Sequence, residues 1–396
     1  MIDLDIKLKV DQIAECIFDK VHKQEAESFG LYSGEFGILL FLLYYARYTQ
    51  NEKHFTITQD YAEKLMQQFV EKEKQHTFCS GLSGILYLFE FLREKEIIDL
   101  DVSQVQSTLD YYIIFRMRHD IRHKYFDYMH GALGVGLYFL KRKTNTEYLQ
   151  ELIDFMHHTA EKDIQNQMFK WESVVDHEKN LLGYNLSMSH GISSIIIFLS
   201  RVVNIGMDDV KIREMLHGAV NYVLSQEKDV AQFGSFFPSF ILKNTQEDIS
   251  KSRMAWCYGD LGIGLALWQA GIAIGKRDWK EKGFEIILQS TKRRTFNETI
   301  VIEAGICHGS AGIAMIYRRM FIETHRNEFE EAFLYWIVQT LNFSRFEDGL
   351  VGYKTHVKGD WECDYSLLTG VSGIGLLLLS YLEKDQQEWD ELFLLS

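Results

Sequence analysis

Ser80-Gly81-Leu82-Ser83-Gly84 is one copy of a short motif that recurs seven times along the 396-residue chain. The first glycines of the copies are Gly34, Gly81, Gly131, Gly191, Gly259, Gly309 and Gly370, at spacings of 47, 50, 60, 68, 50 and 61 residues. A second glycine follows three residues later in every copy except the fourth, where Ser194 stands. Self-similarity of this kind is typical of repeat architectures, in which each repeat is one supersecondary unit.

Each motif opens a run that is apolar nearly all round, for example residues 38–45 and 374–379. A helix without a polar face is a buried helix. Between the motifs lie stretches with one apolar stripe, such as Tyr61, Leu65 and Phe69, four residues apart. Each repeat therefore predicts a half-exposed outer helix and a buried inner helix that begins at the glycines. The paired glycines would let the starts of the inner helices approach each other closely, where a Cβ would collide.

Seven helix pairs give about fourteen helices, and we predict an all-α fold, an α/α barrel or toroid that forms a single domain over residues 1–396. An open solenoid would carry polar caps on its end repeats, but the last inner helix here is as apolar as the middle ones. The alternative is an open α-solenoid used for binding. Two irregular stretches, 233–240 around Pro238 and 348–353, are expected to be long loops or short strands over one mouth of the barrel.

The composition narrows the class of protein. A hydrophobic content of 46% with 25% charged residues is ordinary for a globular protein with a real core. The net charge of −14 argues against nucleic acid as a partner. The first residues show no secretory signal, and the longest apolar stretches are about half of what a membrane span needs. Five cysteines, an odd number, fit reduced thiols, so we expect a cytoplasmic location.

Cysteine and histidine stand beside the glycines of two consecutive repeats. Cys257 lies two residues before Gly259, and Cys307 lies two before Gly309, with His308 between them. If the inner helices all start at one end of a barrel, these three side chains converge at one level. Three nitrogen and sulfur ligands with a fourth position open are typical of a catalytic zinc site. The competing interpretation is that they are small buried residues at tight helix starts.

The other cysteines serve as internal comparisons. Cys79 also lies two residues before a motif glycine, but repeat 2 is three places away from repeat 5 in a ring, too far to share the metal. Cys363 precedes Gly370 by seven residues and is a weaker candidate. Cys16 falls on an apolar stripe and is expected in the core.

Further polar residues cluster in repeats 3 to 5: Asp127, His190, Arg253 and Tyr258. A lone histidine near a helix start is more often a structural residue than a catalyst. Together, however, an acid, an imidazole, a guanidinium and a phenol flank the candidate metal site. At the matching positions repeats 1, 2 and 7 offer only Ser33, Ser80 and Thr369. This asymmetry favours an enzyme over a scaffold.

Trp256-Cys257-Tyr258-Gly259 and Cys307-His308-Gly309, on a sevenfold glycine repeat, resemble the lanthionine synthetase C-like proteins, the lantibiotic cyclases. The resemblance covers essentially the whole chain. It implies an α/α toroid that holds one zinc ion per chain through Cys257, Cys307 and His308, with no other cofactor. It also implies catalytic roles for four residues: His190, Asp127, Arg253 and Tyr258.

The activity that the resemblance implies is a zinc-dependent cyclisation. Cysteine thiolates would add to dehydroalanine or dehydrobutyrine in a dehydrated precursor peptide and form lanthionine and methyllanthionine thioether rings. His190 would transfer protons, oriented by Asp127. Arg253 and Tyr258 would stabilise the enolate oxygen or hold the peptide. A separate dehydratase and an export transporter are implied as partners, in a biosynthetic complex that could bring the chain to the membrane.

Two features depart from the family pattern. His130 precedes Gly131, where acidic or small residues are common, and the small β-rich extension of many cyclases is not located by the sequence. One alternative is a relative that uses the same zinc to add glutathione to dehydrated residues. Another is a non-catalytic helical-repeat binding protein, which would leave the grouping of Cys257, Cys307 and His308 unexplained. The zinc content of the purified protein distinguishes an enzyme from a scaffold.

Overall fold

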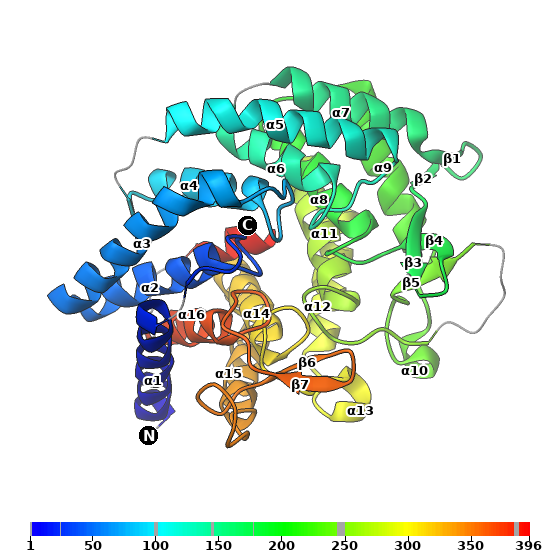
Figure 1. Ribbon diagram of the computed structural model, residues 1–396. Helices are drawn as coiled ribbons and strands as arrows, with labels where there is room; N and C mark the ends of the chain where they lie inside the picture. Colours follow the sequence, from blue (N-terminus) through cyan, green and yellow to red (C-terminus); the bar gives the residue numbers. More distant parts are fainter. Residues whose placement is uncertain are drawn as a thin grey trace. The chain divides into compact units, whose positions relative to one another are not determined.

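The computed structural model (Figure 1) describes residues 2–23, 25–98, 102–143, 146–176, 178–243, 250–383 and 388–396. The chain divides into two compact units. Unit 1 comprises residues 1–101 and 301–396 and contains repeats 1, 2, 6 and 7. Unit 2 comprises residues 102–300 and contains repeats 3 to 5.

Fourteen helices of eleven or more residues lie in the described part of the chain, which confirms the predicted all-α class. The inner helices are α2 (Glu35–Thr49), α4 (Leu82–Glu94), α6 (Ala132–Arg142), α8 (Ile192–Asn204), α11 (Asp260–Ala273), α14 (Ser310–Thr324) and α16 (Val371–Leu382). The outer helices are α1 (Ile2–Lys23), α3 (Glu52–Lys72), α5 (Ser103–Arg122), α7 (Thr146–Thr159), α9 (Val210–Leu224), α12 (Arg277–Ser290) and α15 (Asn327–Asn342). Among the described residues, no helix is both long and apolar enough to cross a membrane.

The burial of the two helix types follows the predicted pattern. Every inner helix has a motif glycine as its N-cap. In α16 each residue from Val371 to Ser380 is buried, as expected for a helix without a polar face. The outer helix α3 instead buries one stripe that includes Tyr61, Leu65 and Phe69. Apolar periodicity was therefore sufficient to assign both types.

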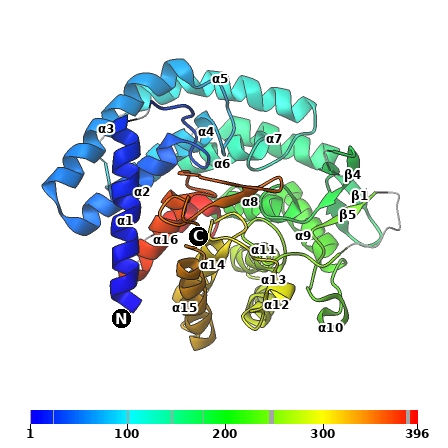
Figure 2. The same ribbon diagram turned by 60° about the horizontal axis from the view of Figure 1, so that its bottom comes forward.

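In unit 1 the first repeat contacts the last one. Helix α16 packs against both α1 and α2, and α14 packs against α15 and α16 (Figure 2). In an open array these end repeats would be separated by the length of the array, since each repeat touches only its neighbours. The contact confirms the predicted packing of repeat 1 against repeat 7. In unit 2 helix α8 contacts α6, α9 and α11, and α11 packs against α12.

The loops before the inner helices are joined by main-chain hydrogen bonds at one position of the repeat, two residues before the motif glycine. In unit 1 the N–H groups of Cys307, Leu368 and Tyr32 donate to the carbonyl oxygens of Leu368, Tyr32 and Cys79 over 2.8–2.9 Å. In unit 2 the N–H of Ser189 donates to the carbonyl oxygen of Cys257 over 3.3 Å. The inner helices of each unit therefore start at a common level, as predicted.

The two glycines of the motif both approach their own loop, but the second also approaches the neighbouring repeat. A Cβ on Gly81, a first glycine, would lie 2.3 Å from the carbonyl oxygen of Gln75 in its own loop. A Cβ on Gly373, a second glycine, would lie 2.0 Å from the carbonyl oxygen of Leu367 in its own loop and 2.8 Å from Cδ1 of Ile306 in the preceding repeat. The expectation that both glycines separate neighbouring helix starts was therefore wrong for the first glycine, which is required by the tight turn that enters its own helix.

Unit 2 contains the small β-rich region that the sequence did not locate. Strands β1 (Glu161–Asp163) and β2 (Met168–Lys170) form an antiparallel pair. Strands β3 (Ser173–Asp176), β4 (Leu181–Asn185) and β5 (Phe240–Leu242) form an antiparallel sheet in that order. Helix α10 (Val230–Phe233) and β5 occupy the predicted irregular stretch 233–240 and its flanks. Strands of three to five residues are too short to give a clear alternation of apolar and polar residues.

Unit 1 has a second small β element next to the other irregular stretch. Leu350 and Tyr353 form an isolated bridge, as expected for a loop with short extended segments. Strands β6 (Thr355–Val357) and β7 (Asp360–Glu362) follow as a hairpin. Its two turn residues, Lys358 and Gly359, both have positive φ, which suits the right-handed twist of the strands. The remaining short elements are α13 (Phe296–Thr299) in unit 2 and the 3₁₀ helix η1 (Trp389–Phe393) in unit 1.

Candidate functional site

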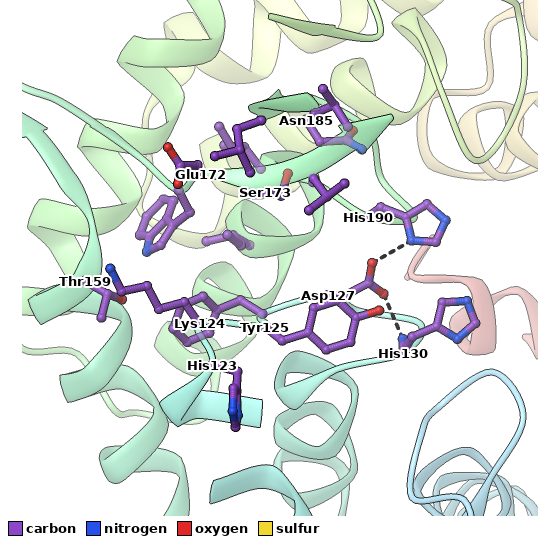
Figure 3. Close-up of a pocket in the computed structure, with 18 of the residues that line it drawn as sticks. His123, Lys124, Tyr125, Asp127, His130, Thr159, Glu172, Ser173, Asn185 and His190 are labelled. Atoms are coloured by element: carbon purple, nitrogen blue, oxygen red, sulfur yellow. Dashed lines mark hydrogen bonds and ion pairs between the residues drawn. The ribbon is translucent and has the colours of Figure 1, made fainter. Parts of the chain in front are cut away.

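Asp127 and His190 form a hydrogen-bonded pair in unit 2, between the loops that lead into α6 and α8 (Figure 3). Nδ1 of His190 lies 2.6 Å from Oδ2 of Asp127. The other carboxylate oxygen, Oδ1, accepts the backbone N–H of His130 over 2.7 Å. Both oxygens of Asp127 thus have partners, which fixes the plane of the carboxylate and, through it, the orientation of the imidazole.

The Asp127–His190 pair leaves Nε2 of the imidazole available for proton transfer. The side chain of His190 is 31% exposed, whereas that of Asp127 is only 10% exposed. Burial favours the neutral ring, but the hydrogen bond and the charge of Asp127 outweigh it and raise the pKa of His190. Because Nδ1 faces Asp127, proton exchange with a substrate falls to Nε2. An imidazole held in this way is suited to general acid–base catalysis.

A chain of polar groups holds the loop of His190 and connects it to Tyr258. The backbone N–H of His190 donates to Oγ of Ser187 over 3.0 Å, and the backbone N–H of Ser187 donates to Oδ1 of Asn185 over 2.9 Å. Nδ2 of Asn185 in turn donates to the hydroxyl oxygen of Tyr258 over 3.3 Å. The sequence analysis missed Asn185 and Ser187. A usable signal existed for Ser187, which stands four residues before its motif glycine, as Asp127 does.

Two aromatic rings adjoin His190. The ring of His130 stacks on it at 5.7 Å between centroids, and the ring of Tyr258 lies at 6.2 Å. Burial lowers the pKa of His130, which favours its neutral form. Burial raises the pKa of Tyr258, so its phenol keeps its proton near neutral pH. Tyr258 is therefore able to donate a hydrogen bond to a developing negative charge.

These groups border a cavity of about 430 Å³ in unit 2 (Figure 3). Asp127, His130, His190 and Tyr258 contribute polar atoms. The apolar lining comes from Phe126, Trp171, Val174, Val175, Leu182, Ile192 and Ile195. Two acids at the border, Glu161 and Glu172, both form ion pairs with Lys243. The cavity thus has a mixed lining of apolar and polar side chains, with the Asp127–His190 pair as its candidate reactive feature.

Arg253 does not line this cavity. Its side chain is half-buried in the loop before α11. Among the residues that the structure describes, its guanidinium has no hydrogen bond or ion pair. The structure therefore brings Asp127, His190 and Tyr258 together at one cavity, whose lining does not include Arg253.

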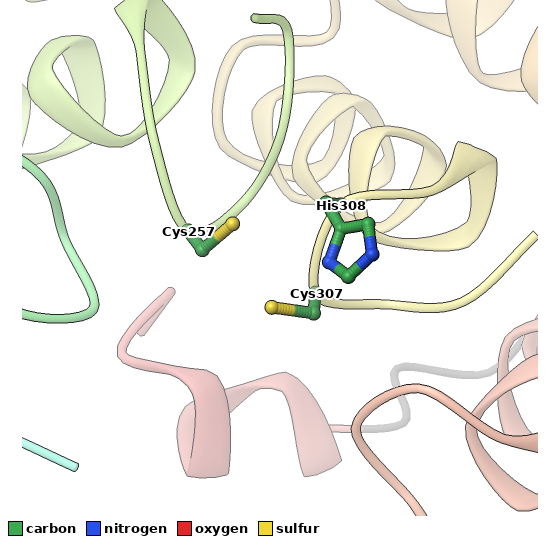
Figure 4. Close-up of side chains that lie close together, drawn as sticks. All are labelled: Cys257, Cys307 and His308. Carbon is green, nitrogen blue, oxygen red and sulfur yellow. The ribbon is translucent and has the colours of Figure 1, made fainter. Parts of the chain in front are cut away.

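Cys257 also belongs to unit 2, where it precedes Tyr258 in the loop that leads into α11 (Figure 4). It is 5% exposed. Its carbonyl oxygen accepts the backbone N–H groups of Met188 and Ser189, at 3.1 and 3.3 Å. The main chain of Cys257 is thereby fixed to the loop that carries His190.

Cys307 and His308 lie next to each other in unit 1, directly before α14 (Figure 4). The sulfur of Cys307 and a ring nitrogen of His308 are within 4.8 Å of each other, close enough to bind one metal ion. Nε2 of His308 lies 2.9 Å from Oε1 of Glu303. Glu303 is a buried acid that was not predicted from the sequence. It stands six residues before Gly309, farther from the glycine than the predicted ligands Cys307 and His308.

The three remaining cysteines lie in unit 1. Cys79 is buried before α4, where its carbonyl oxygen accepts main-chain hydrogen bonds. Cys363 is exposed, and its thiol contacts the carbonyl oxygen of Asp348 at 3.5 Å. Cys16 is only partly buried, so the expectation of a core position was wrong. The buried stripe of α1 includes Ile13 and Ile17, and Cys16 stands at its edge.

Comparison with known proteins identifies the family and supports the fold. The family model of lanthionine synthetase C-like proteins matches residues 25–394. The structure is similar to that of nisin cyclase, with a TM-score of 0.78 and 18% sequence identity over 98% of this chain and 97% of that one. A cellobiose 2-epimerase from Bacillus thermoamylovorans B4167 gives a TM-score of only 0.39 at 10% identity, over 88% and 86% of the two chains, too low to indicate a shared fold. The chain belongs to the lanthionine synthetase C-like family.

Proposed function

We propose that this protein is a zinc-dependent cyclase that adds cysteine thiols to dehydroalanine or dehydrobutyrine residues of a dehydrated precursor peptide, with formation of thioether rings. The observation that carries the proposal is the Asp127–His190 pair at the border of a cavity, in a chain of this family. A binding scaffold has no need for an imidazole whose orientation and pKa are set by a carboxylate. A proton-transfer enzyme does.

The metal ligands we propose are Cys257, Cys307 and His308, for one Zn²⁺ per chain. Thiolate and imidazole donors are the set that zinc prefers, and three of them leave a position for a substrate sulfur. The pair in unit 1 supports the assignment, because Cys307 and His308 place a sulfur and a nitrogen within 4.8 Å. For Cys257 the support is its position: like Cys307, it lies two residues before a motif glycine. When bound, zinc would lower the pKa of a coordinated substrate thiol.

The protein side chains would complete the reaction. The sulfur–Cβ bond forms as the C=C bond of the dehydrated residue opens, and the proton lost by the thiol is balanced by one gained at Cα. His190 is the group we assign to this proton, through Nε2, while Asp127 holds Nδ1. Tyr258 is suited to donate a hydrogen bond to the enolate oxygen, because its phenol remains protonated. Arg253, whose guanidinium has no partner in the described part of the chain, is assigned to holding the peptide.

The cavity beside His190 is a suitable place for part of the peptide. Its volume of about 430 Å³ exceeds that of a single small side chain, and part of its lining, including Val174, Leu182 and Ile195, is apolar. Dehydrated residues are themselves uncharged and weakly polar. We further propose that the substrate comes from a separate dehydratase, that the product leaves through an export transporter, and that the three act in a cytoplasmic complex at the membrane.

Mass spectrometry with thiol alkylation tests the proposal. Purified zinc-loaded protein is incubated with synthetic peptides that contain one dehydroalanine and one cysteine at several separations. Ring closure leaves the mass unchanged but removes the site of alkylation, so we expect cyclised product to be resistant. In a parallel reaction the protein is incubated with glutathione and a peptide that contains dehydroalanine but no cysteine. Glutathione addition without ring closure would replace the proposed function by the alternative one, and the absence of both reactions would contradict a thiol-adding enzyme.

A further inference from the structure

A buried carboxylate in unit 1 has no role in the function proposed above. Glu303 lies in the loop before α14 and is 1% exposed. Its carbonyl oxygen accepts the backbone N–H of Ser310, which fixes its main chain at the start of that helix. Burial of a charged carboxylate is costly unless hydrogen-bond donors surround it. The donors that surround Glu303 therefore show what the fold uses it for.

One carboxylate oxygen is anchored by the β6–β7 hairpin. Oε2 of Glu303 accepts the hydroxyl of Thr355 over 3.2 Å and the backbone N–H of His356 over 2.5 Å. Both donors lie at the start of β6, in the segment that follows the irregular stretch 348–353. The hairpin thus fixes the carboxylate, and the Thr355 hydroxyl also lies 3.4 Å from the other oxygen, Oε1.

That other oxygen is directed at a proposed metal ligand. Oε1 of Glu303 lies 2.9 Å from Nε2 of His308. A carboxylate accepts a hydrogen bond, so Nε2 carries the proton and the lone pair of the neutral ring is on Nδ1. Nδ1 is then the nitrogen that remains for the metal. A histidine ligand whose second nitrogen donates to a carboxylate is a recurrent arrangement at zinc sites.

We propose that Glu303 is a positioning residue for the zinc site: it holds the tautomer and the orientation of His308 so that Nδ1 binds the metal. The inference rests on the proposed function, since it presupposes zinc at His308. It also gives the β6–β7 hairpin a task, because Thr355 and His356 fix the carboxylate. Loss of such a partner typically weakens metal binding by about 10–100-fold.

The experiment measures zinc affinity by competition with a chromophoric chelator. Glu303→Gln keeps the shape of the side chain but removes its charge, and we expect it to weaken zinc binding about 10–100-fold. Glu35→Gln is the matched control: it alters another buried glutamate of unit 1, one that pairs with Lys20. Thr355→Val removes one hydrogen-bond donor to Glu303. We expect it to weaken zinc binding less than Glu303→Gln does and more than Glu35→Gln does.

A spectroscopic measurement on the wild-type protein keeps the inference testable even if Glu303→Gln does not fold. Two-bond ¹H–¹⁵N correlation of the zinc-loaded protein assigns each nitrogen of His308, and we expect Nδ1 on the metal and a proton on Nε2. Ligation through Nε2, or equal zinc affinity in folded Glu303→Gln and wild type, would overturn the role of Glu303. Absence of zinc binding by the wild type would instead overturn the proposed function.

Discussion

The loops of repeats 1 and 2 in unit 1 and those of repeats 3 and 4 in unit 2 serve the same structural purpose with different side chains. In both, a motif glycine caps a buried inner helix. Before the glycines of repeats 1 and 2, Ser33 donates a hydrogen bond to Ser80 over 2.8 Å, and the pair has no acid–base function. In repeats 3 and 4 the corresponding positions hold His130 and His190, whose rings stack at 5.7 Å between centroids. Asp127, three residues before His130, forms the hydrogen bond to His190. The glycines thus encode the fold, and the residues just before them encode the chemistry.

The largest difference between these regions is expected in activity. His190→Ala should reduce ring formation by about 10²–10⁴-fold, because the proton-transfer group is lost while the helix start remains. Ser80→Ala changes the same position of repeat 2 and should leave the rate near that of the wild type. The rates are measured with a dehydrated peptide that the wild type cyclises. A wild-type rate for His190→Ala would remove this residue from the mechanism, and an equal loss in both variants would indicate a purely structural effect.

Substitution of a motif glycine should lower the free energy of unfolding. Gly259 has φ of +93°, and a Cβ there would lie 2.1 Å from the carbonyl oxygen of Arg253. Gly259→Ala should therefore destabilise the protein by about 3 kcal/mol or more, from strained backbone and overlap together. Gly206 has a similar φ of +87° but open space around its Cα, so Gly206→Ala isolates the backbone term, about 1–2 kcal/mol.

Urea unfolding of the metal-free variants measures both values. Equal destabilisation by the two substitutions would show that the close approach to Arg253 contributes nothing. That result would contradict the explanation of the first motif glycine given above.

The fold was largely predictable because its determinants are local. The glycine spacing and the apolar periodicity of 38–45 and 374–379 indicated the inner helices, the outer helices and the contact of repeat 1 with repeat 7. The strands β1 to β4 were not predicted. They are short, and their pairing with each other depends on contacts that no periodicity records.

The candidate site residues that the sequence predicted lie close before a motif glycine. His190, Tyr258, Cys257, Cys307 and His308 stand one or two residues before it, and Asp127 stands four residues before it. Asn185 and Glu303 stand six residues before their glycines and act through hydrogen bonds to other residues. Buried polar residues of this kind differ from ordinary loop residues only in their partners, which become visible in three dimensions.

A smaller effect is expected from substitution of Asp127, the acid of the Asp127–His190 pair. Asp127→Asn should lower the pKa of His190, because the hydrogen bond and the charge of Asp127 are what raise it. Less of the imidazole is then protonated at a given pH, and the limb of the pH–rate profile that belongs to His190 should move to lower pH. NMR titration of the ring protons measures this shift. An unchanged or higher pKa of His190 in Asp127→Asn would contradict the electrostatic role of Asp127.

Zinc content is the most direct test of the claim that position in the repeat fixes the scaffold while side-chain identity fixes the chemistry. Cys79, Cys257 and Cys307 all lie two residues before a motif glycine. Elemental analysis of purified protein should find about one zinc per chain in the wild type and in Cys79→Ala, as expected for a single site of three protein ligands. Cys257→Ala and Cys307→Ala should lose most of the metal. Equal zinc loss in Cys79→Ala and Cys307→Ala, or full retention in Cys257→Ala, would contradict the account.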